Sequence, residues 1–301
     1  MRHTRRAWAL GSLSLLTLAT AFVARIAVRE WRSELPAPHG GLLAPPAGIK
    51  GMTDVRIPVA GRPSLGAWYV PPEHGVVVIV THGSGGDRSS MLPTVRLLSD
   101  AGIGVLAFDW PGHGTSAGDI HWGDTCREAL SAVARWVDAQ PGVDRAQLGV
   151  LGFSYGGYMT AQVAAMDTAF RRIALVGTPS DVTAQVYHAY ARYSRIGGWI
   201  AIQTNAVLGV AEPDTLKAID MVSRFAPRPL LIINGARDAV VPIAMADSLY
   251  ARAGHPKKLL LMPRSGHGDY VWADSVLYGA ALREFFAPAS YPPAIRIATK
   301  R

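Results

Sequence analysis

The 301-residue sequence contains one cysteine, Cys126, and its central part carries no net charge. A single cysteine excludes an internal disulfide, and we interpret it as a small, semi-buried residue at the start of a helical pattern. The net charge of +8 comes from the ends: residues 1–32 hold six arginines against one glutamate, and Arg296, Lys300 and Arg301 lie near the C-terminus. A neutral body offers no basic surface that follows phosphates, so the sequence excludes nucleic acid as a partner.

Long hydrophobic runs are also scarce, and the longest is the stretch of 18 residues from Ala7 to Ala24, which follows a basic cluster. As a helix it would span about 27 Å, marginally enough for the hydrocarbon core of a membrane. We therefore predict a signal or membrane anchor over residues 1–32, in contact with a membrane, and a catalytic domain outside the cytoplasm, in a bacterial-type periplasm or at the cell surface. A Pro/Gly-rich linker over residues 33–52 and a basic tail over residues 288–301 flank the central part.

Between these ends, over residues 53–287, apolar segments of strand length alternate with helical patterns. The expected strands are Asp54–Val59, Leu65–Val70, Val76–Val80, Val105–Phe108, Gln147–Leu151, Ile173–Val176, Leu230–Asn234 and Lys258–Met262, and the expected helices are Met91–Ala101, Asp124–Ala139, Tyr155–Met166, Ile243–Ala253 and Val271–Phe286. This alternation predicts an α/β protein with a mostly parallel sheet covered by helices on both faces.

The segment LGFSYGG, residues 151–157, places Ser154 between two glycines, directly after an apolar strand and directly before a helical pattern. A G-x-S-x-G turn of this kind presents a nucleophilic serine at a tight strand-to-helix corner. Asp238 and His267 each follow a later apolar strand by one short loop, so the order Ser, Asp, His predicts a nucleophile, an acid and a base. Asp181, which follows the strand at Ile173, is an alternative acid.

These segments resemble the α/β-hydrolase family through GFSYGG, INGARDAVVP and MPRSGHGDY, together with the earlier segments HGSGG and DWPGHGTS. The resemblance implies the α/β-hydrolase fold and an oxyanion hole formed by the main-chain N–H groups of Ser84 and Tyr155. It also implies that residues 182–224, in an unusually long interval between two strands, form a helical cap over the active site. The residues expected to contact substrate are Trp110, Tyr187, Tyr190 and Trp199. The alternative is a cap that packs only on the sheet and leaves the site open.

The predicted activity is that of a serine hydrolase that cleaves a small-molecule carboxylic ester through an acyl-enzyme, with no metal or organic cofactor. Two alternatives stay open. The elbow G-x-S-Y-G-G also resembles that of prolyl oligopeptidase-type peptidases, although those enzymes usually carry a large propeller domain for which this chain is too short. A non-catalytic hydrolase-fold binding protein is the other alternative, although such proteins normally lack a triad residue.

Overall fold

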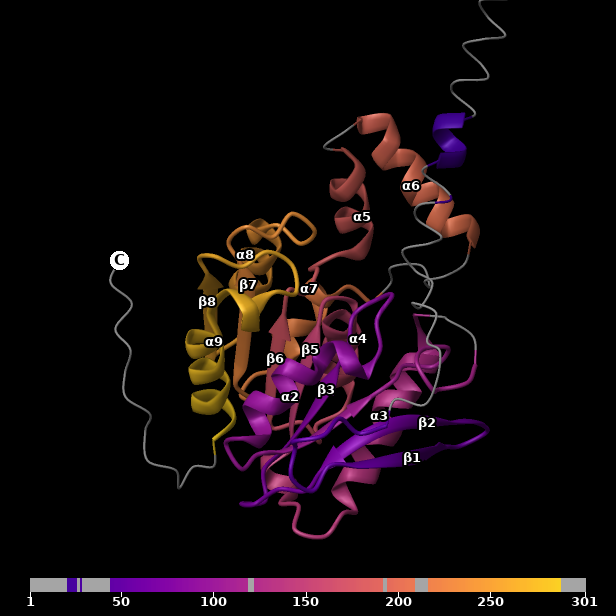
Figure 1. Ribbon diagram of the computed structural model, residues 1–301. Helices are drawn as coiled ribbons and strands as arrows, with labels where there is room; N and C mark the ends of the chain where they lie inside the picture. Colours follow the sequence, from indigo (N-terminus) through magenta and orange to yellow (C-terminus); the bar gives the residue numbers. More distant parts are fainter. Residues whose placement is uncertain are drawn as a thin grey trace, which may run out of the picture.

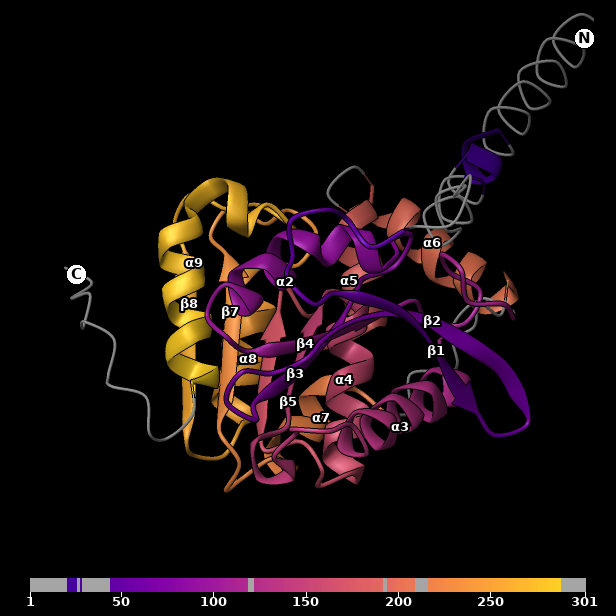
Figure 2. The same cartoon turned by 60° about the horizontal axis from the view of Figure 1, so that its bottom comes forward.

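The computed structural model describes residues 21–25, 28, 44–118, 122–191, 194–208 and 216–287. Its centre is an eight-stranded sheet in the order β1-β2-β4-β3-β5-β6-β7-β8 (Figure 1). The strands are β1 Thr53–Val59, β2 Arg62–Val70, β3 Val77–Thr81, β4 Gly104–Phe108, β5 Gly149–Phe153, β6 Arg172–Val176, β7 Leu230–Gly235 and β8 Lys257–Met262. Strand β2 is antiparallel to β1 and to β4, and the strands from β3 to β8 run parallel. Figure 2 shows the β1–β2 hairpin at one edge of the sheet and β8 at the other.

Helices cover both faces of this sheet because successive side chains of each buried strand point to opposite sides. In β3, Val77 and Ile79 pack in the cluster that contains residues of α3, α4, α7 and α8, whereas Val78 and Val80 pack with α2 and α9. The helices are α2 Leu92–Ser99, α3 Asp124–Asp138, α4 Tyr155–Met166, α7 Ala218–Met221, α8 Ile243–Arg252 and α9 Tyr270–Phe286, and the short 3₁₀ segments are η1 Arg88–Met91, η2 Arg145–Gln147 and η3 Val222–Arg224. The arrangement confirms the predicted α/β class.

The last helix is interrupted close to its start. At Asp274 the backbone leaves the helical region, with φ −162° and ψ 83°. The Asp274 carboxylate accepts a hydrogen bond from the N–H of Leu277 at 2.9 Å, which caps the helix that resumes after the break. Residues 270–273 therefore form a separate turn between the His267 loop and the long part of α9.

Two further helices, α5 Val182–Ala191 and α6 Arg195–Leu208, project beyond the end of the sheet at which the parallel strands terminate (Figure 1). They pack on each other around a small cluster of their own, formed by Val186, Ile200 and Ala201. Because α7 and η3 pack against α4 and α8, they belong to the body. In the described residues the projecting part is therefore the α5–α6 hairpin, shorter than the predicted 182–224, and we call this hairpin the cap.

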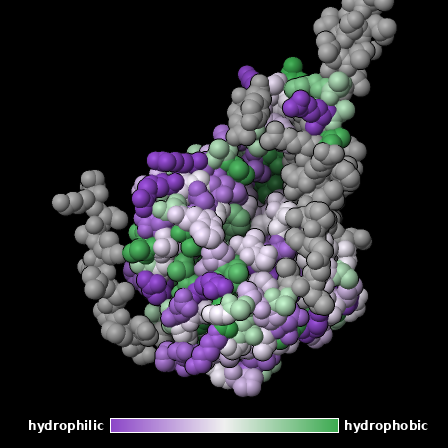
Figure 3. Space-filling model, in the orientation of Figure 1, coloured by the Kyte–Doolittle hydropathy of each residue, from purple (hydrophilic) through white to green (hydrophobic). Residues whose placement is uncertain are grey.

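The predicted N-terminal signal or anchor lies mostly outside the described residues, and the basic tail lies wholly outside them. In the part of the chain that the structure describes, no helix has the length and apolar character needed to cross a membrane. On the face drawn in Figure 3, hydrophilic and hydrophobic residues are intermixed over the body and over the cap.

Candidate active site

Ser154 lies on a sharp turn between β5 and α4. It has φ 53° and ψ −123°, and it is the one non-glycine residue with positive φ among the described residues. A side chain at Gly152 would come within 2.5 Å of the Cα of Gly157, and one at Gly156 would overlap the carbonyl oxygen of His82. The two flanking glycines are thus required by close packing, and a strained conformation at this position is typical of a functional residue.

The three predicted catalytic side chains meet at this turn. The Oγ of Ser154 lies 3.0 Å from Nε2 of His267, and Nδ1 of His267 lies 2.8 Å from Oδ2 of Asp238. The other oxygen of Asp238 accepts hydrogen bonds from the N–H groups of Val240 and Val241, both at 2.8 Å. The Asp238 side chain is completely buried and that of His267 is 19% exposed. In this geometry the imidazole can accept the serine proton on one nitrogen while the carboxylate holds the N–H on the other.

The alternative acid, Asp181, is engaged elsewhere. Its carboxylate lies 2.6 Å from Nζ of Lys217 and accepts the N–H of Ala184 at the start of α5. The neighbouring Ser180 carbonyl accepts the N–H of Ile219 at 3.0 Å, so the segments that lead into and out of the cap are tied together at its base. The structure therefore pairs His267 with Asp238 and gives Asp181 a structural place.

The two predicted oxyanion-hole residues each adjoin a segment that contacts the nucleophile. Tyr155 is the first residue of α4, so its N–H lies beside Ser154 at the positive end of the helix dipole. In the loop after β3, a Cβ added to Gly83 would come within 2.9 Å of the Cβ of Ser154. Ser84 is the next residue after this close approach, and its contribution to an oxyanion hole stays a prediction.

Trp110 is not at the surface of this site. Its side chain is fully buried, its Nε1 donates to the carbonyl of His82 at 3.0 Å, and its backbone N–H donates to His82 Nε2 at 3.2 Å. The Nδ1 of His82 in turn donates to the carbonyl of Gly83 at 2.8 Å. The expectation that Trp110 contacts substrate is therefore corrected: it holds the loop that carries Ser84 in place.

A buried ion pair supports the same loop, and the sequence did not indicate Arg88 as a member of it. Arg88 and Asp109 are both fully buried, with Nη1 of Arg88 2.6 Å from Oδ2 of Asp109. The guanidinium also lies 2.8 Å from Asp54, and the N–H groups of Arg88 and Thr115 donate to the Asp109 carboxylate. Burial raises the pKa of Asp109, and the positive charge of Arg88 opposes that rise. The pair connects the Ser84 loop to the loop after β4.

We expect the substitution Asp109→Asn to destabilise the protein by about 3 to 5 kcal/mol, because it leaves the buried Arg88 charge without its closest partner. Urea unfolding followed by circular dichroism would measure this change. Glu128→Gln is the matched control, since Glu128 pairs with Arg62 in an exposed position, and it should change stability little. Equal stability of the two variants would contradict the supporting role of Asp109.

The three predicted substrate-contacting residues of the cap have different surroundings. Tyr187 packs against α6, where a side chain at Gly198 would come within 2.8 Å of its ring, and Tyr190 packs on the cap's own cluster. Trp199 is 59% exposed. The structure places Tyr187 and Tyr190 in the contact between α5 and α6, and their contact with substrate stays a prediction. The cap contacts the loop that carries Asp238 through Gln185, whose Nε2 donates to the carbonyl of Val240 at 3.4 Å.

Sequence reasoning missed Tyr270, although it lies in the segment that carries His267. Its hydroxyl lies behind the triad: a side chain at Gly177 would come within 2.6 Å of this oxygen and 3.4 Å of Nδ1 of His267. Burial, and to a lesser extent the Asp238 carboxylate, raises the pKa of Tyr270 far above its ordinary value, so its phenol is neutral. In the described part of the chain no three His, Cys, Asp or Glu side chains lie close enough together to hold a metal ion.

Comparison with known families agrees with this geometry. The model of the prolyl oligopeptidase family matches residues 88–288, more than half of the chain, and this range includes Ser154, Asp238 and His267. The chain belongs to the prolyl oligopeptidase family. Uncharacterized protein Rv2307c of Mycobacterium tuberculosis is 27% identical to it over 239 residues, which cover 77% of this chain and 78% of that protein. The uncharacterized protein YfhR of Escherichia coli strain K12 is 27% identical over 229 residues, covering 73% and 74%.

Among solved structures, the esterase Pf2001 of Pyrococcus furiosus superposes with a TM-score of 0.70 at 21% identity, covering 84% of this chain and 97% of that one. This similarity establishes the α/β-hydrolase fold that the sequence motifs implied. With the family match, it identifies the chain as a hydrolase of the α/β type.

Proposed function

We propose that this member of the prolyl oligopeptidase family is a serine hydrolase that cleaves a carboxylic ester through an acyl-enzyme intermediate. The observation that carries the proposal is the continuous hydrogen-bonded line from Ser154 through His267 to the buried Asp238, on a strained turn at the end of a parallel strand. A nucleophile hydrogen-bonded to a base, with the base oriented by a third group, is the arrangement that acyl transfer needs.

In the proposed reaction, His267 Nε2 accepts the proton of Ser154 as the Oγ attacks the carbonyl carbon. Asp238 holds the proton on Nδ1 and stabilises the imidazolium that forms. The N–H groups of Ser84 and Tyr155 bind the developing oxyanion. The tetrahedral intermediate then collapses: the bond to the leaving oxygen breaks, and His267 passes its proton to that oxygen. Water, activated by the same imidazole, hydrolyses the acyl-enzyme.

A peptidase is the second candidate, because the family to which the chain belongs is named for peptide cleavage. The described body, residues 44–287 with short gaps, forms one hydrolase domain and the α5–α6 hairpin, and within it there is no propeller of the kind those peptidases usually carry. The esterase Pf2001 shares this fold over 84% of this chain and 97% of its own, and this similarity supports the ester proposal.

The test is a comparison of two substrate sets on the full-length protein: p-nitrophenyl esters from acetyl to palmitoyl, and p-nitroanilides of proline-containing dipeptides. We expect ester turnover that disappears in Ser154→Ala, with a chain-length optimum set by the site. Faster cleavage of the anilides would establish the peptidase, and absence of turnover on both sets would favour a binding protein.

A further inference from the structure

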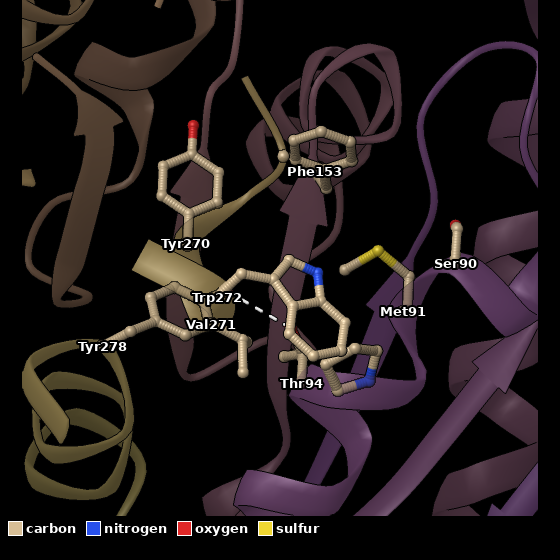
Figure 4. A pocket seen from close by; sticks show the side chains of 10 residues that line it. Ser90, Met91, Thr94, Phe153, Tyr270, Val271, Trp272 and Tyr278 are labelled. Atoms are coloured by element: carbon tan, nitrogen blue, oxygen red, sulfur yellow. Dashed lines mark hydrogen bonds between the residues drawn. The ribbon is translucent and has the colours of Figure 1, made fainter. Parts of the chain in front are cut away.

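A cleft opens next to the triad, between the start of α2 and the start of α9 (Figure 4). It is partly open to solvent, and its cavity volume is about 50 Å³. Its wall combines aromatic and apolar side chains with polar atoms in about equal exposed amounts, and the residues that matter here are Met91, Thr94, Phe153, Tyr270, Trp272 and Tyr278. None of the residues that the structure describes around the cleft is charged.

Phe153 separates the cleft from the triad. It directly precedes Ser154, and its ring centre lies 5.0 Å from that of His267, with the two planes 37° apart. Side chains added at Gly83 and Gly268 would lie 3.3 Å and 3.1 Å from the same ring. The Ser84 loop and the His267 loop therefore both pack on Phe153, whose ring contacts His267 and also lines the cleft.

Trp272 lies across the cleft in Figure 4, yet it is 78% exposed. A tryptophan usually stabilises a fold by burying its large apolar surface. One that is this exposed contributes little stability in that way. Its turn is nevertheless fixed. The Asp269 carboxylate accepts the N–H of Gly266 at 2.8 Å, and Arg264 lies 3.0 Å from Asp274. The backbone that carries the indole is thus tied to the His267 loop.

The deep end of the cleft is neutral. Thr94 Oγ1 and the hydroxyl of Tyr278 form a hydrogen bond of 3.4 Å there, drawn as a dashed line in Figure 4. Burial raises the pKa of Tyr278 to about 12, so the phenol stays protonated at neutral pH. An uncharged cleft lined by aromatic rings and by polar atoms fits a neutral ring-bearing group that also carries a hydroxyl, and it disfavours a carboxylate or an ammonium.

We propose that this cleft binds the leaving alcohol of the substrate, and that this alcohol carries an aromatic ring, as in a benzyl or phenylethyl ester. The inference rests on the proposed function. When the tetrahedral intermediate collapses, the bond from carbon to the leaving oxygen breaks and His267 Nε2 supplies the proton, so the leaving oxygen faces the imidazole. The group on that oxygen then lies on the His267 side, where Phe153 and Gly268 border the cleft. The product is a neutral alcohol, which matches the uncharged lining.

The first test separates the two halves of the ester. One series keeps the acetyl group and varies the alcohol through ethanol, benzyl alcohol and 2-phenylethanol; the other keeps ethanol and varies the acid through acetyl, phenylacetyl and 3-phenylpropanoyl. We expect Trp272→Ala to lower kcat/KM about five- to tenfold for the aromatic acetates and to leave ethyl acetate within about twofold. All acetates share one acyl-enzyme, so this difference reports on acylation and not on the common deacylation step.

Val276→Ala is the matched control, because Val276 is 68% exposed on the same helix and does not line the cleft. It should change neither series. A Trp272→Ala effect that follows the acid instead of the alcohol, or that is equal for every ester, would overturn the assignment.

The second test does not depend on turnover. Binding of 4-fluorobenzyl alcohol to the Ser154→Ala protein is followed by fluorine NMR, with Trp272→Ala and Val276→Ala each added to that background. We expect saturable binding that Trp272→Ala weakens about five- to tenfold and Val276→Ala retains. Trp272-dependent binding without any ester turnover would sustain the cleft and contradict the proposed reaction. Ester turnover with no dependence of binding on Trp272 would do the reverse.

Discussion

Asp238→Asn is expected to lower kcat by about four orders of magnitude while the protein stays folded. The reason lies in the two N–H groups of Val240 and Val241, which both donate to one oxygen of the carboxylate. In the variant these donors require the amide oxygen in that position, so the amide NH₂ turns toward His267. An NH₂ group donates to Nδ1 and forces the ring proton onto Nε2, which can then no longer accept the proton of Ser154.

The measurement is kcat on the best ester, with Asp181→Asn as the control. Asp181 follows strand β6 and was the alternative acid, but it pairs with Lys217 at the base of the cap. We expect Asp181→Asn to change kcat by no more than about tenfold. A large loss of kcat in Asp181→Asn together with a small loss in Asp238→Asn would contradict our assignment of Asp238 as the catalytic acid.

The features that sequence predicted well are those with short-range causes. Alternating strands and helices follow from local apolar patterns, and each expected strand lies within a few residues of an observed one. The elbow was recognisable because Gly152 and Gly156 face backbone atoms so closely that a side chain does not fit, which leaves a fixed signature around Ser154. The loops that carry Asp238 and His267 could be found because parallel strands end at one edge of the sheet.

The features that sequence could not predict depend on which way a side chain points after packing. Trp110 follows a strand at the correct edge, yet its ring turns inward to His82, and no pattern in the sequence distinguishes this from a substrate contact. The pairing of Arg88 with Asp109 joins residues 21 positions apart on different loops. Tyr187 shows the same limit: its helix was anticipated, but the packing of its ring against Gly198 could not be read from the sequence.

The assignment of Ser154 as nucleophile can be tested by removing its hydroxyl while the backbone around it stays in place. Ser154→Ala is expected to lower kcat by about six orders of magnitude, since base and acid have no function without the Oγ, and to abolish labelling by a fluorophosphonate. Intact-protein mass spectrometry would show one adduct per chain in the wild type and none in the variant. The backbone that approaches Ser154, including Gly83 and the start of α4, is unchanged by this substitution, so the variant should retain its thermal stability.

Ser84→Ala tests whether a second serine could be the nucleophile. Ser84 directly follows Gly83, whose backbone approaches Ser154 closely. Its proposed contribution is its main-chain N–H, which alanine keeps, so Ser84→Ala should still be labelled once and should lose at most about tenfold in kcat. An adduct that persists in Ser154→Ala and disappears in Ser84→Ala would transfer the nucleophile to the loop. A single adduct that depends on Ser154 alone would assign the attack to the Ser154 hydroxyl. Ser84 would then contribute only its main-chain N–H to binding of the oxyanion.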